Sequence, residues 1–301
     1  MKKIFTLMVV LFATVSIVKA NVEFAYDAGA EIVSAYIWRG MYNGGLSFQP
    51  DVEIGFDGEN SSFRIGAWGN IGASDWKFQK GLPKYPDDSN PNTYFVPELD
   101  IVGSFSIYGL SLGFNHYYYC DGSNFFSWQK AQDVYDAGNT STTEVWAGYN
   151  FGHFFGDKAG AYLNWYTTVA GNDVNVSTIY PFMAPAQDVA TRAWSSYLEV
   201  GYDFTFETIG LTVGAQVGMS PWKSPIYGNE KFAVVNVSAK VDKAWEFDVV
   251  TLNLFAQGSI NPDGLVTNPK DADYNLFVNA AGDDKIGVQR LNGAIGLGIW
   301  F

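Results

Sequence analysis

The sequence predicts an all-β fold: a transmembrane antiparallel up-and-down β-barrel of about 12 strands, with short turns at one end and long loops at the other. First, apolar residues recur at every second position in short segments. Second, the chain is 17% aromatic with 32 glycines, while its 16% charged residues fall below the ~25% of soluble domains. Third, segment 291–301 has one apolar face and one small or polar face. Such a strand suits a barrel closed in lipid.

Residues 1–20 are typical of a cleaved secretory signal peptide. A basic start precedes an almost wholly apolar run from Ile4 to Val18, and Ala20 is small enough for cleavage after it. The apolar run is shorter than the ~20 residues that a transmembrane helix needs. We therefore expect an exported protein whose residues 21–301 form one barrel domain in the cell outer membrane.

Twelve segments carry the alternation, and turn-forming or polar stretches separate them. The predicted strands are Ala28–Arg39, Ser47–Asp57, Ser62–Gly72, Tyr94–Ile107, Leu110–Cys120, Thr142–Phe151, Ala159–Val169, Ser195–Phe206, Leu211–Met219, Phe232–Val241, Phe247–Gln257 and Leu291–Phe301.

The second predicted strand shows the pattern most clearly. Phe48, Val52 and Phe56 share one face, and Asp51 and Glu53 lie on the other. A buried soluble core would not accept acids at successive positions, whereas a water-filled lumen tolerates them. Each strand is therefore expected to be apolar outside and polar inside.

The connections between the predicted strands mostly alternate between short and long along the chain. An even number of strands places both termini and the short turns on the periplasmic side, and the long loops on the extracellular side. A tight loop at Tyr42–Gly45 is the exception. A soluble sandwich or lipocalin-like barrel does not require this regularity. The predicted long loops are 74–93, 121–140, 171–193 and 258–286.

The side chains expected to face the lumen are rich in carboxylates. Acidic rings favour cations in a pore. Alternatively, Arg39 and Arg64 pair with these acids and fill the interior. Both outcomes are compatible with 12 strands, because barrels of about eight strands are filled by side chains and those of about 16 to 18 enclose an open channel. A narrow pore is the reading we prefer. The pore-lining candidates are Glu31, Arg39, Asp51, Glu53, Arg64, Trp68, Glu98, Asp100, Glu144, Trp146, Glu199, Asp203 and Lys240.

The tryptophans predict interfacial anchoring. Trp38 near one end of the first strand, and Trp245 and Trp300 near the other end of the barrel, match the two aromatic belts of such barrels. Trp68 and Trp146 have inward parity instead. They could form a stacking track for a sugar or nucleoside.

An enzyme in the barrel wall is the rival class of function. Outer-membrane lipid hydrolases need a serine nucleophile and a histidine base on the lipid-facing surface. His116 has outward parity but Ser111 has the opposite one, and His153 falls in a predicted turn. We expect His116 in the outer aromatic girdle and no catalytic residue.

The composition also argues against other partners and cofactors. The net charge of −13 opposes nucleic-acid binding. Cys120 is the single cysteine, so an internal disulfide or thiolate metal site is not expected. Asp271 and Asp273 begin like a calcium loop, but Leu276 stands where the turn needs glycine. No metal or cofactor is predicted.

Several stretches resemble the TorF-type porin family of Gram-negative outer membranes, and the first half of the chain resembles it best. The resemblance implies an outer-membrane pore and supplies no catalytic residue. It matches Arg39, Gly40, Glu98, Asp100 and Glu144 to recurring positions of that family. The similar stretches are Ser34–Gly40 followed by Ser47–Phe56, Ala67–Asn70, Pro97–Ser106 and Thr143–Asn150.

Together these features predict passive diffusion of small polar, in particular cationic, solutes through an acid-lined, narrow lumen. The alternatives are a non-conducting barrel whose extracellular loops bind a partner or surface, and a barrel-embedded lipid hydrolase. The expected partners are outer-membrane lipid, lipopolysaccharide, small polar solutes and the barrel assembly machinery, which would read Phe301 as a carboxyl-terminal signal. Whether barrels associate into a homo-oligomer is left open.

Overall fold

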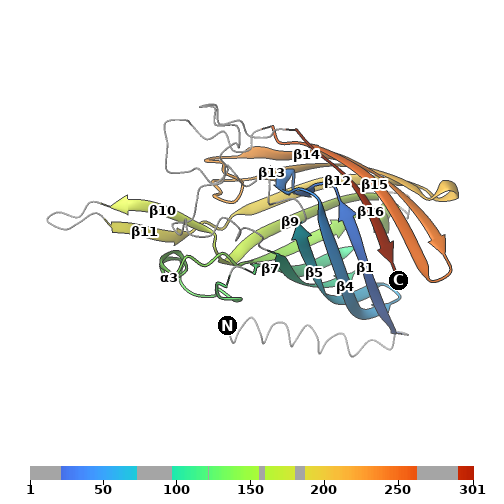
Figure 1. Ribbon diagram of the computed structural model, residues 1–301, viewed down its shortest axis with the longest axis horizontal. Coiled ribbons are helices and arrows are strands. Elements are labelled where there is room, and N and C mark those ends of the chain that lie inside the picture. Colours follow the sequence, from blue (N-terminus) through green and yellow to red (C-terminus); the bar gives the residue numbers. More distant parts are fainter. Residues whose placement is uncertain (1–21, 73–96, 121, 156–159, 180–186, 263–290) are drawn as a thin grey trace.

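The computed structural model describes residues 22–72, 97–120, 122–155, 160–179, 187–262 and 291–301. Twelve strands form one closed antiparallel barrel (Figure 1), which confirms the predicted fold class and strand number. The barrel strands are β1 Glu23–Val33, β4 Ser47–Gly58, β5 Ser61–Gly72, β6 Glu98–Ile107, β7 Leu110–Tyr119, β8 Thr142–Asn150, β9 Gly160–Gly171, β12 Ser196–Phe206, β13 Leu211–Ser220, β14 Ala233–Phe247, β15 Val250–Ile260 and β16 Leu291–Trp300.

Four further strands form two hairpins outside the barrel sheet. The first hairpin joins β1 to β4, and the second projects from one end of the molecule between β9 and β12 (Figure 1). None of the helices in the described ranges is long and apolar enough to span a membrane. The remaining elements are β2 Tyr36–Trp38, β3 Met41–Gly44, β10 Val174–Ile179, β11 Gln187–Arg192, helix α3 Ala131–Asp136, helix α4 Gly152–Phe155 and the 3-10 helix Glu207–Ile209.

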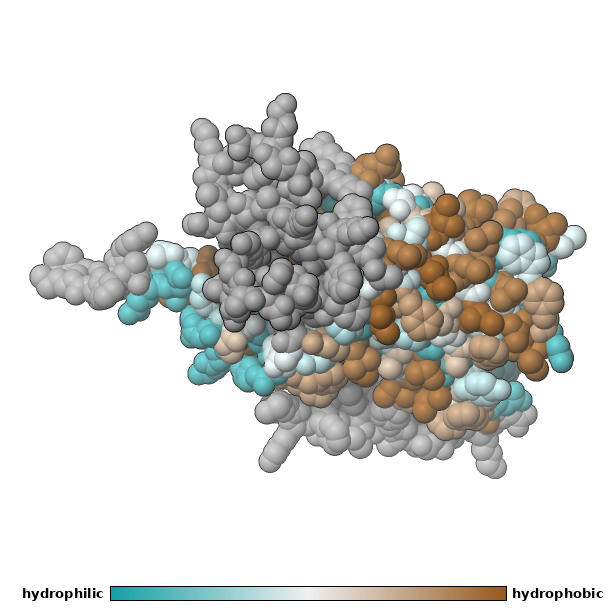
Figure 2. Space-filling view, viewed as in Figure 1, coloured by the Kyte–Doolittle hydropathy of each residue, from teal (hydrophilic) through white to brown (hydrophobic). Residues whose placement is uncertain are grey.

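The outer face of the barrel is apolar. Figure 2 shows hydrophobic residues gathered over the strands, and hydrophilic residues over the end that carries β10 and β11. On β16, Leu291 and Ile295 are 68% and 60% exposed, whereas Asn292 and Ala294 of the other face are buried. Water disfavours such an exterior, whereas a lipid bilayer favours it. The predicted division of each strand into two faces is therefore confirmed on β16.

Inner glycines make room for the large rings of neighbouring strands. A Cβ atom on Gly113 would lie 2.5 Å from the Trp146 ring, and one on Gly218 would lie 2.0 Å from the Tyr197 hydroxyl. Glycine allows this close approach because it has no side chain. The high glycine content thus allows an aromatic interior.

The short turns all lie at one end of the barrel, as predicted. The connections are 59–60, 108–109, 151–159, 207–210 and 248–249. One predicted turn, Asp242–Glu246, is wrong because β14 continues to Phe247 and the chain turns at Asp248, whose φ is 40°. A polar stretch can extend a strand beyond the lipid, so polarity alone did not mark the turn.

The first predicted strand is also wrong in its second half. β1 ends at Val33, and the chain then leaves the wall to form the β2–β3 hairpin before it returns at Ser47. The connection spans residues 34–46, so the apparent exception of a tight loop disappears. All six connections at that end are long.

The barrel closes between β1 and β16. Ile32 lies opposite Leu297, and the paired stretch of β1 is Gly29–Val33. Ser34 extends this seam beyond β1, donating its N–H to the Ile295 carbonyl at 2.8 Å. The pairing stops there because the chain turns inward.

Candidate functional site

The β2–β3 hairpin crosses the barrel lumen. The Asn292 side chain of β16 donates a hydrogen bond to the Gly40 carbonyl at 2.7 Å. On another part of the wall, the ring of Tyr36 lies 5.4 Å from that of Trp68 on β5. Because inward side chains of well-separated strands contact the same hairpin, it forms a constriction inside the barrel.

Two left-handed residues form the tip of this hairpin. Arg39 and Gly40 have φ values of 48° and 81°, and they connect the paired residues Trp38 and Met41. This is the backbone of a two-residue type I′ turn, which favours Asn-Gly or Gly-Gly. A Cβ atom on Gly40 would lie 2.8 Å from Asn236. Arginine pays about 1–2 kcal/mol in this conformation, so its side chain must gain from contacts elsewhere.

Arg39 makes a buried ion pair with Glu144 of β8. The guanidinium donates from Nη1 to Oε2 at 2.7 Å and from Nη2 to Oε1 at 2.8 Å. The two side chains are 9% and 4% exposed. Such a two-pronged geometry is the strong form of a charge-assisted hydrogen bond.

Aromatic rings surround the same guanidinium. Its Cζ atom lies 4.1 Å from the ring centre of Tyr166 and 4.6 Å from those of Tyr197 and Trp38. These distances are within cation–π range. Nη1 also donates to the Tyr227 hydroxyl at 2.7 Å. We call the four residues outside the hairpin, Glu144, Tyr166, Tyr197 and Tyr227, the Arg39 cage.

Tyr227 belongs to the loop between β13 and β14, outside the barrel strands. Burial raises the pKa of its phenol above the usual range, which keeps the group neutral. Its ring stacks on Tyr197 at 5.5 Å and on Trp38 at 6.0 Å. The charge of the cage therefore comes from the carboxylate of Glu144.

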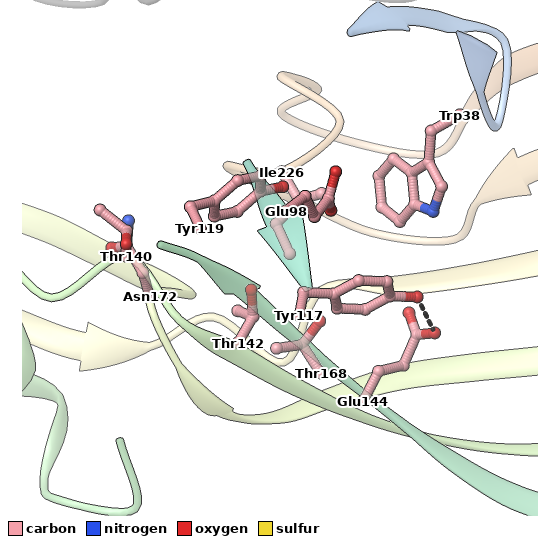
Figure 3. Close-up of a pocket in the computed structure, with 10 residues that line it drawn as sticks. All are labelled: Trp38, Glu98, Tyr117, Tyr119, Thr140, Thr142, Glu144, Thr168, Asn172 and Ile226. Atoms are coloured by element: carbon pink, nitrogen blue, oxygen red, sulfur yellow. Dashed lines mark hydrogen bonds between the residues drawn. The ribbon is translucent and has the colours of Figure 1, made fainter. Parts of the chain in front are cut away.

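A cavity lies on each side of the hairpin. One, of about 170 Å³, is bounded by Trp38 of the hairpin and by Glu98, Tyr117 and Glu144 of the wall. Figure 3 shows Trp38 facing Tyr117 and Glu144. The other, of about 180 Å³, is lined by β2 residues together with Glu31, Lys240 and others. Each can hold several water molecules, at about 30 Å³ per water.

Two carboxylates of β6 face the lumen, and one of them, Glu98, lines the first cavity. Glu98 and Asp100 are 5% and 7% exposed. The Oδ1 atom of Asp100 is buried without a hydrogen-bond partner among the residues that the structure describes. Both predicted candidates thus lie inside, next to Tyr36 of the hairpin, which borders the second cavity.

Two more charged candidates, Arg64 and Lys240, form ion pairs elsewhere in the lumen. Arg64 pairs with Glu53 at 3.2 Å and with Asp57 at 2.5 Å, and Lys240 pairs with Asp242 at 3.3 Å. One part of the predicted alternative is therefore observed: Arg39 and Arg64 both form ion pairs with acids inside the barrel. Two cavities remain beside these ion pairs, and the open, narrow lumen stays a prediction.

The positions of other predicted candidates follow from the pairing register of the strands that carry them. Asp51 lies opposite Trp68, and Asp203 lies opposite Gly214, whose added Cβ would be 2.2 Å from the carboxylate. Glu199 accepts a hydrogen bond from Tyr197 at 3.1 Å. Arg39 differs from all of these, because it is on the hairpin tip and not on a barrel strand.

The tryptophans are distributed between the inside and the outside of the barrel differently from the prediction. Trp38 lies inside the barrel on the hairpin, so its assignment to an outer belt is wrong. Trp300 has inward parity and its ring lies against Gly29, so its belt assignment is wrong too. Trp245 is 40% exposed on the outer side of β14. Trp146 lies inside, 6.1 Å from Tyr166.

His116 is buried and not part of an open girdle. It is 1% exposed, because the rings of Phe125 and Phe126 cover it at 4.8 and 4.6 Å. Its Nδ1 lies 2.9 Å from the Thr143 hydroxyl and its Nε2 lies 2.7 Å from the Phe125 carbonyl. These contacts fix the ring structurally and give it no serine nucleophile. His153 belongs to α4 at the turn end.

Three cage residues were missing from the predicted site. Tyr166 and Tyr197 share the inward parity of their strands, so the alternation could have found them. Tyr227 lies between β13 and β14, where no alternation applies. The sequence therefore carried a signal for two of the three rings.

No family model and no curated protein matches the sequence. Among solved structures, OmpF of Salmonella typhi is 10% identical over 94% of this chain and 98% of that chain, with a TM-score of 0.37. An outer membrane channel of Pseudomonas putida F1 is 8% identical over 93% and 94%, with a TM-score of 0.42. The P. putida toluene transporter TodX is 11% identical over 96% and 91%, with a TM-score of 0.33. At this distance the matches assign neither family nor solute.

The geometry itself defines the class. A closed antiparallel 12-stranded barrel with an apolar exterior and a charged interior is the architecture of outer-membrane β-barrels. The resemblance to TorF-type porins stays a prediction. The predicted signal peptide at 1–20 and the acidic segment at Asp271–Leu276 lie outside the described residues.

Proposed function

We propose that this protein is an outer-membrane channel for small polar solutes, with a preference for cations. The observation that carries the proposal is the lumen itself: a carboxylate-rich interior with a cavity on each side of the hairpin. The resemblance to TorF-type porins implies the same class of function.

The preference for cations follows from the imbalance of charge. The ion pairs of the described lumen engage Glu144, Glu53, Asp57 and Asp242. Further inward carboxylates, among them Glu98 of the first cavity and Glu31 of the second, remain for a passing cation. A negative lining lowers the free energy of cations in the pore and raises that of anions.

The hairpin makes this channel narrow. Cavities of about 170 and 180 Å³ accommodate a hydrated inorganic ion or a small organic solute in each compartment. We therefore expect single-channel conductance well below that of a wide 16-stranded barrel, whose lumen is an open channel.

Planar-bilayer recording tests the proposal. Purified full-length protein should produce discrete current steps, and the reversal potential in a salt gradient should indicate cation preference. An absence of channels at high protein load would contradict the channel function. A reversal potential of the opposite sign would contradict the acid-lined pathway alone.

A second candidate function rests on the projecting β10–β11 hairpin. It extends beyond the barrel at the loop end and packs against α3 (Figure 1). A rigid projection of this kind suits contact with a partner or surface by a barrel that does not conduct. Protein that gives no current, but whose binding to cells is lost when β10–β11 is removed, would favour this function.

A further inference from the structure

The wall of the Arg39 cage is held in place by groups other than the hairpin. Asn115 and Tyr117 of β7 each donate a hydrogen bond to Oε1 of Glu144, both at 3.1 Å. Tyr197 accepts a hydrogen bond from Asn236 at 3.1 Å and donates one to Glu199 at 3.1 Å. The carboxylate and this ring would therefore keep their positions if Arg39 were withdrawn.

The chemistry of the cage matches a planar cation. Both Glu144 oxygens face the guanidinium in a bidentate arrangement, which a carboxylate forms with guanidinium and not with a simple ammonium. The rings of Tyr166 and Tyr197 supply aromatic faces at 4.1 and 4.6 Å from the same carbon. Tyr227 adds a hydroxyl acceptor at 2.7 Å.

Arg39, which occupies the cage, belongs to the β2–β3 hairpin and not to the barrel sheet that forms most of the cage. Arg39 sits at the tip of a hairpin in a left-handed conformation that disfavours arginine. The first cavity reaches the cage, since Glu144 lines both, and Trp38 of the cavity lies 4.6 Å from the Arg39 Cζ atom. A solute in that cavity lies next to the ion pair.

We propose that the Arg39 cage is a binding site for solutes that carry a guanidinium group, and that Arg39 is a built-in competitor for it. A guanidinium solute displaces Arg39 from Glu144 and occupies the cage in its place. The hairpin tip is then released from the wall. The consequence for transport rests on the proposed channel function, whereas binding to the cage does not.

The test uses full-length protein in detergent and methylguanidinium as the probe. Arg39→Asn removes the guanidinium but keeps a residue that tolerates the left-handed backbone. Calorimetry should show methylguanidinium binding to Arg39→Asn at least tenfold tighter than to the wild type, whose cage is filled. The double variant Arg39→Asn/Glu144→Gln should lose that gain.

Arg64→Asn is the matched control. It also frees two lumen carboxylates, Glu53 and Asp57, but no aromatic ring lies over the Arg64 guanidinium within cation–π range among the described residues. It should bind methylguanidinium no better than wild type. Tetramethylammonium, which cannot form the paired hydrogen bonds, should bind Arg39→Asn at least tenfold more weakly than methylguanidinium.

Three results would overturn the proposal. They are a folded Arg39→Asn that binds no better than the wild type, an equal gain in Arg64→Asn, and equal binding of the two cations. Heat-dependent gel mobility reports whether the barrel has folded. If Arg39→Asn does not fold, Arg39→Gly is the second variant, and failure of both would overturn the claim that the wall is preformed.

Conductance separates this site from the channel function. A folded Arg39→Asn that binds methylguanidinium but carries no current contradicts the channel and supports the cage. A variant that conducts, yet neither binds methylguanidinium nor is blocked by it at millimolar concentration, contradicts the cage and leaves the channel standing.

Discussion

Glu144 accepts hydrogen bonds from three other side chains in the lumen. Its oxygens accept hydrogen bonds from Arg39, Asn115 and Tyr117, and it is 3% exposed. Burial of a charge is costly unless the charge is paired, so both members of this ion pair depend on each other.

Glu144→Gln should destabilise the barrel, because it leaves the Arg39 guanidinium buried without its counter-charge. Removing one partner of a buried pair costs about 3–5 kcal/mol. Urea unfolding followed by gel mobility measures this as a lowered midpoint. Glu53→Gln is the control: its carboxylate is 32% exposed, and partly exposed pairs contribute about 0–1 kcal/mol. Equal midpoints for the two variants would contradict the prediction.

Phe301 contributes to closure of the seam at the turn end. Its N–H donates to the Ala28 carbonyl at 2.8 Å, and its side chain is 58% exposed. Deletion of Phe301 should reduce insertion into the outer membrane far more than it reduces the conductance of the molecules that insert. Fractionation of cells measures the inserted share.

Phe155→Ala controls for loss of an exposed aromatic ring at the same end, since Phe155 is 75% exposed. It should insert like the wild type. Normal insertion of the chain without Phe301 would show that this residue is not read during assembly.

At the scale of elements, we expect the β2–β3 hairpin to limit passage through the proposed channel. Replacing Tyr36–Gly44 with two glycines should raise single-channel conductance several-fold, because it joins the two cavities that the hairpin separates. Removing β10–β11, which lies outside the barrel, should leave conductance within twofold of wild type. Unchanged current after loss of β2–β3 would mean that the limiting constriction lies elsewhere.

The projecting hairpin is fastened at its base by Asp173. This buried carboxylate accepts hydrogen bonds from the Ser195 N–H at 2.8 Å and from the Ser195 hydroxyl at 2.6 Å. Burial raises the Asp173 pKa, and the hydrogen bonds from Ser195 partly offset that rise.

Asp173→Ala should loosen β10–β11 without unfolding the barrel. The substitution leaves buried donors of Ser195 unsatisfied, at a cost of about 1–3 kcal/mol. Limited proteolysis should cut the hairpin faster, while gel mobility of the barrel stays unchanged. Asp136→Ala, which removes an exposed acid of α3, should not change the cleavage rate. Equal rates for both variants would contradict the role of Asp173.

At the scale of the whole molecule, we expect the charge of the lumen to set the ion preference of the proposed channel. Glu98→Gln combined with Asp100→Asn removes two buried carboxylates from the inner face of β6. The ratio of cation to anion permeability should fall, because the lining loses negative charge. Reversal potentials in a salt gradient measure the ratio. A ratio unchanged within error would place the selectivity filter away from β6.

Strand number, the order of turns and loops, and the inward or outward parity of the residues checked on β16 could be predicted from the sequence. Each depends on the two-residue alternation of an extended backbone, which is a local property. The inward positions of Glu98, Asp100 and Glu144 followed from it. The prediction for Trp300 was wrong although the alternation in its strand indicates an inward side chain. It was assigned to the outer aromatic belt because it lies near the end of the chain.

Only the tertiary structure decided what fills the barrel. Segment 36–44 continues the apolar pattern of β1, yet it leaves the wall because its ring and guanidinium partners lie across the lumen. Arg39 and Glu144 are 105 residues apart in the chain. Alternation fixes which way a side chain points within one strand, whereas their contact exists because twelve strands close into a ring.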